Sequence, residues 1–143
     1  MTVYRRILWA VDLTDGSVAI GRKAQALAAL LGAELELLHV VEFVPVEPMG
    51  ETLMPIGQMQ DELLESARQR LTALCTELGL TGVPCRVESG NVKSEIVRVA
   101  RERHADLIIL GGRERHGLSI LVNFTEDTVL HAAPCDVLAM RAR

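Results

Sequence analysis

Aromatic residues are scarce in this chain: only 3% of its 143 residues are Phe, Trp or Tyr. The chain therefore has few side chains on which bases could stack, which disfavours that mode of nucleic-acid binding. Positive charge is not in excess either, since the net charge is −4, so nothing attracts the chain generally to nucleic acid or to an anionic membrane. No apolar run approaches the roughly 20 residues that a membrane span needs. We expect neither a nucleic-acid partner nor a membrane partner.

Closely spaced cysteines are also missing. Cys75, Cys85 and Cys135 are an odd number and form no Cys-x-x-Cys spacing, whereas disulfide frameworks and zinc sites need paired or clustered cysteines. We predict three reduced thiols that act as small buried residues. Arg5-Arg6 is not followed by an apolar region of leader length, so no signal peptide is expected and a cytoplasmic location is predicted.

The sequence contains no Walker loop, no zinc-ligand spacing and no nucleophile triad. His116 has no carboxylate or nucleophile partner in its own motif, so it gives little support for acid–base catalysis. We predict no catalytic residue and no metal site.

Apolar residues make up 49% of the chain, enough for a full core in one domain over residues 1–143. Short apolar or alternating runs predict strands over Ile7–Val11, Glu34–Val41, Pro84–Ser89, Leu107–Leu110 and Cys135–Met140. Helical spacing predicts helices over Val18–Leu31, Met59–Leu78, Val92–His104 and Thr125–His131. This alternation calls for parallel βαβ units with right-handed crossovers, with the first and fourth strands in central positions.

Local signals refine this outline. Thr14-Asp15-Gly16-Ser17 offers N-cap chemistry for the first helix, and Gly32 and Gly79 stand where helices should end. A leucine-rich stripe on the second helix is predicted to be core: Leu63, Leu64, Ala67, Leu71, Leu74 and Leu78. The segment Glu42–Gln58 is rich in Pro and Gly and has no period, so we expect a surface excursion.

The ends of the first and fourth strands are the candidate site. Asp12 closes the first strand, and Gly111-Gly112 closes the fourth and leads into a basic loop. In an open parallel sheet, ligands bind where the strand order reverses, at the carboxyl ends of the strands. Asp12 equally suits a cap of the following turn, and His39 at the second strand tip suits a packed, hydrogen-bonded role.

The chain resembles the universal stress protein family along its whole length. The resemblance is carried by an ordered set of motifs: Ile7–Asp12, Leu37–Val40, Gly90, Ala105–Gly111, Arg115–Leu118 and Ala133–Leu138. It implies a single-domain α/β fold, a flavodoxin/Rossmann-like open parallel sheet of five strands in order 3-2-1-4-5 with helices on both faces. It also implies a homodimer through the last strand, and many members bind ATP between the first and fourth strands.

The same resemblance implies which residues would hold a nucleotide. In ATP-binding members the position of Asp12 contacts the adenosine, the position of Val40 lies near the base, and a Gly-x-x-Gly loop with a later Gly-Ser or Gly-Thr binds the phosphates. The corresponding candidates for binding ATP or AMP are Ala10, Val11, Asp12, Val40, Gly111, Arg113, Glu114, Asn123, Phe124 and Thr125.

The phosphate-binding part of this pattern is altered. Glu114 replaces the second glycine, and Asn123-Phe124 replaces the later Gly-Ser. A carboxylate about 4 Å from a phosphate oxygen would cost about 4 kcal/mol at an effective dielectric of about 20. Arg113 and its basic neighbours Arg115 and His116 act in the opposite direction, but the sequence favours loss of tight ATP binding.

Two functions follow from these observations. The first is a dimeric, non-enzymatic stress-response module without a cofactor, acting on an unidentified protein partner. The alternative is a protein that binds ATP or AMP, with slow ATP hydrolysis at most. A phosphoacceptor receiver domain fits worse, because Ser89 and Arg141 stand where an aspartate and a lysine are needed. A flavin-binding protein also fits worse, because the loop after the first strand, Leu13–Ser17, lacks the hydroxyl-rich cradle of a flavin phosphate.

The dimer has its own physical motive. The last predicted strand is apolar and belongs at an edge of the sheet, where an uncovered strand invites aggregation. Pairing with a second copy would cover this edge, so the predicted dimer residues are Val137, Leu138, Ala139 and Met140.

Overall fold

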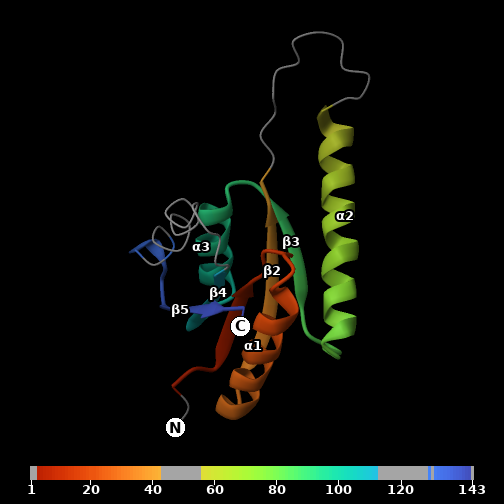
Figure 1. Cartoon of the computed structure of the whole chain (residues 1–143). Coiled ribbons are helices and arrows are strands. Elements are labelled where there is room, and N and C mark those ends of the chain that lie inside the picture. The colour runs from red at the N-terminus through yellow and green to blue at the C-terminus, as the bar shows by residue number, and fades with distance from the viewer. Residues whose placement is uncertain (1–2, 43–55, 113–128, 130, 143) are drawn as a thin grey trace, which may run out of the picture.

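The computed structural model describes residues 3–42, 56–112, 129 and 131–142 (Figure 1). Its strands are β1 (Arg6–Ala10), β2 (Glu34–Val41), β3 (Cys85–Ser89), β4 (Leu107–Gly112) and β5 (Asp136–Arg141). Its three labelled helices are α1 (Ser17–Leu31), α2 (Ile56–Glu77) and α3 (Val92–Glu102). The strands form one five-stranded sheet in the order β3-β2-β1-β4-β5, and every neighbouring pair is parallel. This confirms the predicted fold class and strand order.

The first and fourth strands lie inside the sheet, as predicted. β1 pairs with β2 on one side and with β4 on the other. Three consecutive residues of β1, Ile7, Leu8 and Trp9, are each only 1% exposed. A continuous apolar run of this kind is typical of a parallel strand that is covered on both faces.

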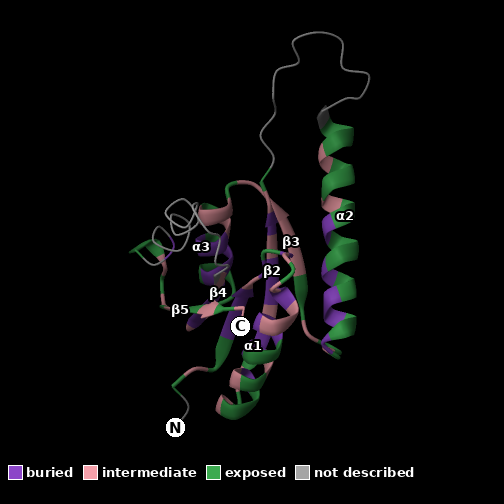
Figure 2. Cartoon of the chain, in the orientation of Figure 1, coloured by how far each residue is buried: buried purple, intermediate pink, exposed green. Residues whose placement is uncertain are grey.

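Two hydrophobic cores cover the two faces of the sheet (Figure 2). The alternation of side chains along a strand sends Trp9 to one face and Leu8 to the other. On the face of Trp9 pack α1 and α2, with Ile20 and Leu71 among the buried residues. On the face of Leu8 packs α3, with Val99 at its centre. Helices therefore cover both faces of the sheet.

The leucine stripe of α2 is core only over part of its length. Ala67, Leu71, Leu74 and Leu78 are buried, but the prediction was wrong for Leu63, which is 46% exposed, and held only in part for Leu64, which is half-buried. Figures 1 and 2 show why: the first turns of α2 extend beyond the sheet, where no strand lies beneath them. Apolar periodicity identified the helix and its inner face, but not how much of that face meets the sheet.

The predicted ends of helices are also explained. α1 ends at Gly32, which adopts the left-handed conformation with φ 64°, and Gly79 follows α2 with φ 68°. Asn91 is the N-cap of α3, and its side chain accepts a hydrogen bond from the backbone N–H of Ser94 at 3.0 Å. These conformations and caps satisfy backbone groups that a helix end leaves unpaired.

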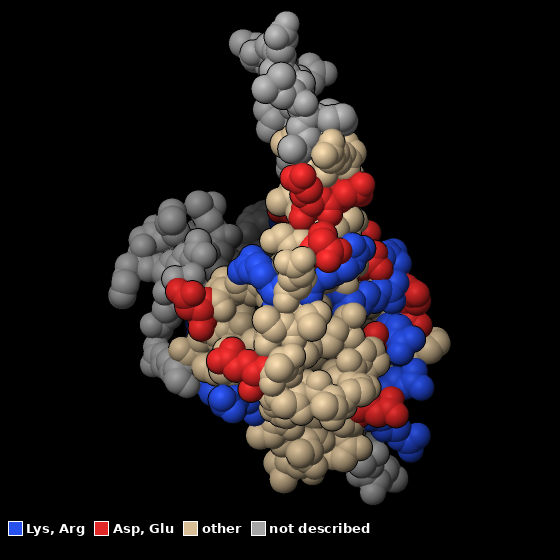
Figure 3. Space-filling view, turned by 90° about the vertical axis from the view of Figure 1, so that its right-hand side faces the viewer, with Lys and Arg blue, Asp and Glu red and all other residues tan. Residues whose placement is uncertain are grey.

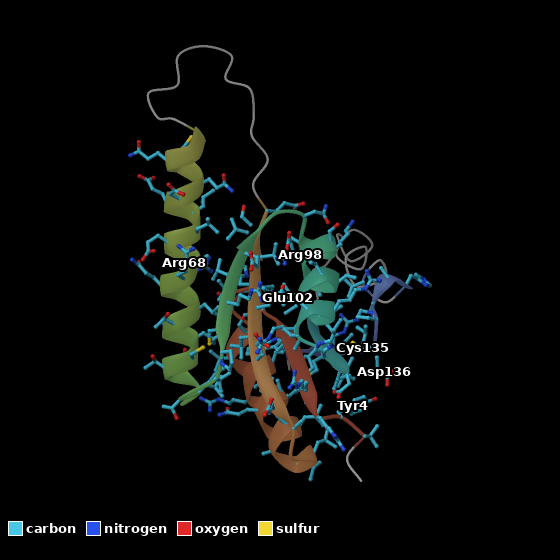
Figure 4. All side chains as sticks on the ribbon, turned by 180° about the vertical axis from the view of Figure 1, so that it is seen from behind. Tyr4, Arg68, Arg98, Glu102, Cys135 and Asp136 are labelled. Atoms are coloured by element: carbon cyan, nitrogen blue, oxygen red, sulfur yellow. The ribbon has the colours of Figure 1, made fainter. Side chains whose placement is uncertain are left out.

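At the amino ends of the strands, Asp106 joins β4 to β1. Its Oδ1 atom accepts the backbone N–H groups of Arg5 at 3.1 Å and Arg6 at 3.0 Å, and its own N–H donates to the Arg6 carbonyl at 2.9 Å. Nearby, the Tyr4 hydroxyl donates to Asp136 Oδ2 at 2.8 Å (Figure 4). This hydrogen bond is the largest of the effects that raise the pKa of Tyr4.

The cysteines depart from the prediction of three buried thiols. All three are free. Cys75 is buried and Cys135 is half-buried, but Cys85 is exposed. Cys85 is the first residue of the edge strand β3, so only part of its surroundings is protein.

Two predicted segments fall largely outside the described residues. Of the excursion predicted over 42–58, residues 43–55 lie outside them, and the prediction was wrong for residues 56–58, which belong to α2. Of the helix predicted over 125–131, the described positions 129 and 131 are both helical, and Val129 is fully buried against the α3 side of the sheet. Among the described residues, no helix combines the length and the hydropathy needed to cross a membrane.

Candidate functional site

The candidate site lies at the carboxyl ends of β1 and β4, where the strand order reverses. Ala10 pairs with Leu110 of β4, and the N–H of Val11 donates to the Leu38 carbonyl of β2 at 2.7 Å. The predicted residues Ala10, Val11, Asp12, Val40 and Gly111 therefore converge on one end of the sheet. Arg113, Glu114, Asn123, Phe124 and Thr125 lie outside the described residues.

Asp12 is fastened to its own loop. Its Oδ1 atom accepts hydrogen bonds from the Thr14 hydroxyl at 3.0 Å, the Ser17 hydroxyl at 3.0 Å and the Thr14 N–H at 3.3 Å. Ser17 is only 3% exposed, and its hydroxyl oxygen accepts a second bond from the Thr14 N–H at 3.0 Å. The carboxylate thus organises the turn between β1 and α1.

This network corrects the predicted N-cap. The hydroxyl groups of Thr14 and Ser17 bind Asp12, and the N-cap position of α1 is occupied by Gly16, which has no side chain to cap with. Gly16 is required by packing, because a Cβ atom there would lie 2.4 Å from the Cβ of Ala142. The end of the chain beyond β5 therefore packs on the start of α1.

Leu13 lies between these groups in an uncommon conformation. Its φ of 55° is in the left-handed region, which a non-glycine residue seldom adopts. Its side chain is buried, and its carbonyl accepts a hydrogen bond from the guanidinium group of Arg70 on α2. Contacts from two helices and the core thus hold this turn in one conformation.

His39 of β2 lies beside the same turn. Its Nδ1 atom is 2.6 Å from the Val11 carbonyl oxygen, and since a carbonyl only accepts, Nδ1 carries the proton. Burial lowers the pKa of His39, and Arg70 lowers it further, while the Val11 carbonyl and Asp12 oppose this. The imidazole is therefore neutral at neutral pH. The predicted packed, hydrogen-bonded role of His39 is confirmed.

Gly111 is explained by packing as well. It lies in β4 opposite Met140 of β5, and a Cβ atom at this position would lie 2.6 Å from the Cδ1 atom of Ile20. This separation is too short for two carbon atoms, so a larger residue at position 111 would force the end of the buried Ile20 side chain on α1 to move. The packing of Ile20 therefore favours glycine here whether or not a ligand approaches it.

An open cavity of about 540 Å³ lies at the opposite end of the sheet, near the first residues of β1, β2 and β3. Its charged lining is partly paired: Arg103 Nε lies 2.9 Å from Glu36 Oε2, and Arg6 Nη1 donates to the Arg103 carbonyl at 3.2 Å. Parallel sheets of this type bind ligands at their carboxyl ends, so we do not assign the site to this cavity.

Basic side chains around α3 are engaged in ion pairs (Figure 4). Arg98 lies 2.6 Å from Glu95 and 3.0 Å from Glu102, and Arg86 of β3 lies 2.7 Å from Glu88. A hydrogen bond from Arg86 holds the pKa of Glu102 below its usual range. On the face shown in Figure 3, acidic and basic side chains lie near one another. The described residues form no group of three His, Cys, Asp or Glu side chains suited to a metal ion.

Sequence reasoning missed several residues that build this region. Ser17 and Arg70 hold the turn after β1, and Ile20 sets the size limit at Gly111. It also missed that Cys75 and Cys85, which form no close spacing in the sequence, meet in space. The sequence did hold a signal for this contact. Cys75 and Cys85 lie at similar distances on either side of the turn after Gly79, and a helix and the strand that follows it run in opposite directions, which brings such positions together.

The strand order and the position of the candidate site define the class: a doubly wound parallel α/β protein whose candidate site lies at the topological switch point. Within that class, the family model described as "Universal stress protein family" matches residues 3–141. The chain belongs to the universal stress protein family.

Individual proteins and solved structures of this family are also similar to the chain. Universal stress protein A homolog 1 of Coxiella burnetii is 36% identical over 138 residues, with 96% of each chain covered. A solved universal stress protein family structure from Burkholderia pseudomallei matches with a TM-score of 0.71 at 26% identity, with 96% of both chains covered. A crystal structure of a universal stress protein in complex with cAMP matches at a TM-score of 0.61, 22% identity and 98% coverage of both chains. At that identity the likeness shows the fold alone.

Proposed function

We propose that this chain is a dimeric stress-response module whose nucleotide crevice has degenerated, so that ATP binding is weak or lost and no reaction is catalysed. The observation that carries the proposal is the state of Asp12. The carboxylate oxygen Oδ1 of this candidate adenosine contact accepts three hydrogen bonds from its own turn.

The other described residues of the crevice support the same view. His39 donates its Nδ1 proton to the Val11 carbonyl, and Gly111 makes room for Ile20. Each residue thus has a structural task that needs no ligand. Glu114 and Phe124, at the altered phosphate positions of the sequence, add charge repulsion and bulk, respectively.

The alternative function is binding of ATP or AMP, with slow hydrolysis at most. Two observations favour it. The side chain of Asp12 remains exposed although it is hydrogen-bonded, so a ribose hydroxyl could still reach it, and a structural relative was solved in complex with cAMP.

Thermal unfolding with and without Mg-ATP separates the two functions. A ligand present at 100 times its Kd adds about 2.7 kcal/mol to the free energy of unfolding, which raises the Tm by several degrees. We expect no shift at millimolar Mg-ATP or Mg-AMP beyond that given by Mg-pyrophosphate, the matched control for ionic effects. A saturable shift specific to the adenine nucleotide would favour the alternative.

The dimer is proposed to form through β5. This strand is an edge of the sheet, and Leu138 on it is 38% exposed. Two copies related by a two-fold axis would pair their β5 edges and remove the unpaired strand.

Size-exclusion chromatography with light scattering tests this dimer. Leu138→Pro and Leu138→Lys should each shift the protein from dimer to monomer or aggregate. Leu30→Lys is the matched control, because Leu30 is 83% exposed and lies in α1, not in a strand. A dimer that survives both Leu138 variants would place assembly on another surface.

A further inference from the structure

Two thiols from different elements meet on the α2 side of the sheet. Cys75 lies in the last turns of α2, and Cys85 is the first residue of β3. The chain reverses between them, and their Sγ atoms lie 2.7 Å apart. A disulfide bond measures about 2.05 Å, so a small movement of either side chain would bring the two sulfur atoms to bonding distance.

The two thiols differ in access. Cys75 is 8% exposed and belongs to the core with Leu71 and Leu78, whereas Cys85 is exposed at the sheet edge. The Cys85 thiol also lies 3.4 Å from the Val83 carbonyl oxygen. A solvent-borne oxidant would therefore meet Cys85 first and find Cys75 directly behind it.

We propose that Cys75 and Cys85 are a redox-sensitive pair, which hydrogen peroxide converts reversibly to an intramolecular disulfide between α2 and β3. In the first step the Cys85 thiolate attacks one peroxide oxygen. An S–O bond forms, the O–O bond breaks, and the leaving hydroxide takes up a proton as water. Cys85 is then a sulfenic acid.

In the second step the Cys75 sulfur attacks the sulfenic sulfur of Cys85. The S–S bond forms, the S–O bond breaks, and the oxygen leaves as a second water with the Cys75 proton. The two thiols lose two electrons in total and the peroxide gains them. A dithiol such as dithiothreitol restores both thiols by exchange.

The chemistry of Cys75 suits this second role. Burial, together with its hydrogen bond to Cys85, raises the pKa of Cys75 to about 12, so Cys75 remains a thiol at neutral pH and reacts poorly with free peroxide. Cys75 does not need high intrinsic reactivity for the second step, because it lies next to Cys85 and the attack occurs within one folded molecule.

Oxidation would fasten α2 to the sheet. The bond would close a loop between residues ten apart in sequence and restrict the unfolded chain. Two other side chains of α2 already bind the sheet side of the molecule: Arg70 donates a hydrogen bond to the Leu13 carbonyl, and Gln60 donates one to the Ser89 hydroxyl. The oxidised form should therefore unfold at a Tm higher by about 5 to 10 °C.

Intact mass spectrometry of the full chain tests the proposal. After treatment with hydrogen peroxide, the unalkylated monomer should be lighter than the reduced monomer by two hydrogen atoms. When the same sample is quenched with N-ethylmaleimide, it should take up one maleimide, whereas the reduced monomer takes up three. Both cysteines fall in one tryptic peptide, Leu71–Arg86, so this peptide should carry the loss. Dithiothreitol should restore three alkylated thiols and the lower Tm.

Three variants locate the reaction. Cys75→Ala and Cys85→Ser should abolish both the mass loss and the rise in Tm, whereas the matched control Cys135→Ser should keep both. Burial raises the pKa of Cys135 to about 11, so this third thiol should stay reduced. The proposal is overturned if wild type keeps three alkylatable thiols, accumulates sulfinic acid on Cys85, or forms only disulfides between chains. Circular dichroism of each reduced variant shows whether it has folded.

Discussion

Two aspartates, at opposite ends of the sheet, show how differently the same side chain can serve this fold. Asp12 stands at the carboxyl end of β1, and within the described residues its hydrogen bonds go to its own turn, through Thr14 and Ser17. Asp106 stands at the amino end of β4 and accepts backbone N–H groups about a hundred residues away, from Arg5 and Arg6. The first bonds are local, and the second join two central strands.

The comparison separates family membership from ligand binding. Both aspartates belong to motifs that carry the resemblance to universal stress proteins, yet the carboxylate of each accepts hydrogen bonds from backbone or hydroxyl groups of the chain itself. A motif residue can therefore mark the fold without marking a ligand. If so, removal of either aspartate should lower stability, and by more for Asp106.

The largest effect is expected at Asp106. Asp106→Ala removes the acceptor for two backbone N–H groups and should lower the free energy of unfolding by about 2 to 3 kcal/mol, in the range of hydrogen bonds to charged groups. Urea denaturation measures this. Asp136→Ala is the control, because Asp136 is exposed and, within the described part of the chain, its carboxylate accepts a side-chain hydroxyl, that of Tyr4, and not backbone N–H groups. Equal losses in the two variants would contradict the special role of Asp106.

Next comes Gly111. Gly111→Ala would place a methyl group 2.6 Å from Ile20 Cδ1 and should cost about 2 kcal/mol through overpacking. Ile20→Val removes that Cδ1 atom, so the double variant should lose less than the sum of the two single variants in a double-mutant cycle. Simple additivity would show that the glycine is not required by this contact.

A smaller effect is expected at Asp12. Asp12→Ala frees the hydroxyl groups of Thr14 and Ser17 and should lower stability by about 1 kcal/mol. Asp12→Asn keeps the Oδ1 acceptor and should lie close to wild type. If Asp12→Ala unfolds like wild type in urea, the carboxylate does not organise the turn.

The smallest effect concerns pH. Because burial lowers the pKa of His39 from 6.5, the unfolded chain binds a proton there more readily than the folded chain. The stability that His39 contributes is fully present above pH 6.5 and is lost as pH falls from 6.5 through the folded pKa. His39→Asn keeps a donor at the position of Nδ1 and should flatten this part of the pH profile of unfolding. An unchanged profile would mean that other groups cause it.

Much of the fold could be predicted from local patterns. The segment Glu34–Val41, which alternates at first and then becomes apolar, predicted the bounds of β2 without error. Gly32 and Gly79 marked helix ends because both adopt the left-handed conformation that glycine favours. The strand order came with the family resemblance, since local periodicity does not say which strands are neighbours.

The remaining details depend on packing between distant segments. The exposure of Leu63 depends on where the sheet stops beneath α2, and the need for Gly111 depends on where Ile20 lands. The hydroxyl groups of Thr14 and Ser17 were predicted to serve the start of α1, but they bind Asp12 instead. The left-handed turn at Leu13, which lies between Asp12 and Thr14, could not be predicted from the sequence pattern.

The central claim is that the end of β1 and Gly111 of β4 form scaffold and not a nucleotide site. Backbone amide NMR shifts of the full chain, followed during titration with Mg-ATP, test it at the residues themselves. We predict that the amides of Val11, Asp12, Thr14 and Gly111 keep their shifts up to millimolar nucleotide. Saturable shifts confined to these amides would contradict the account.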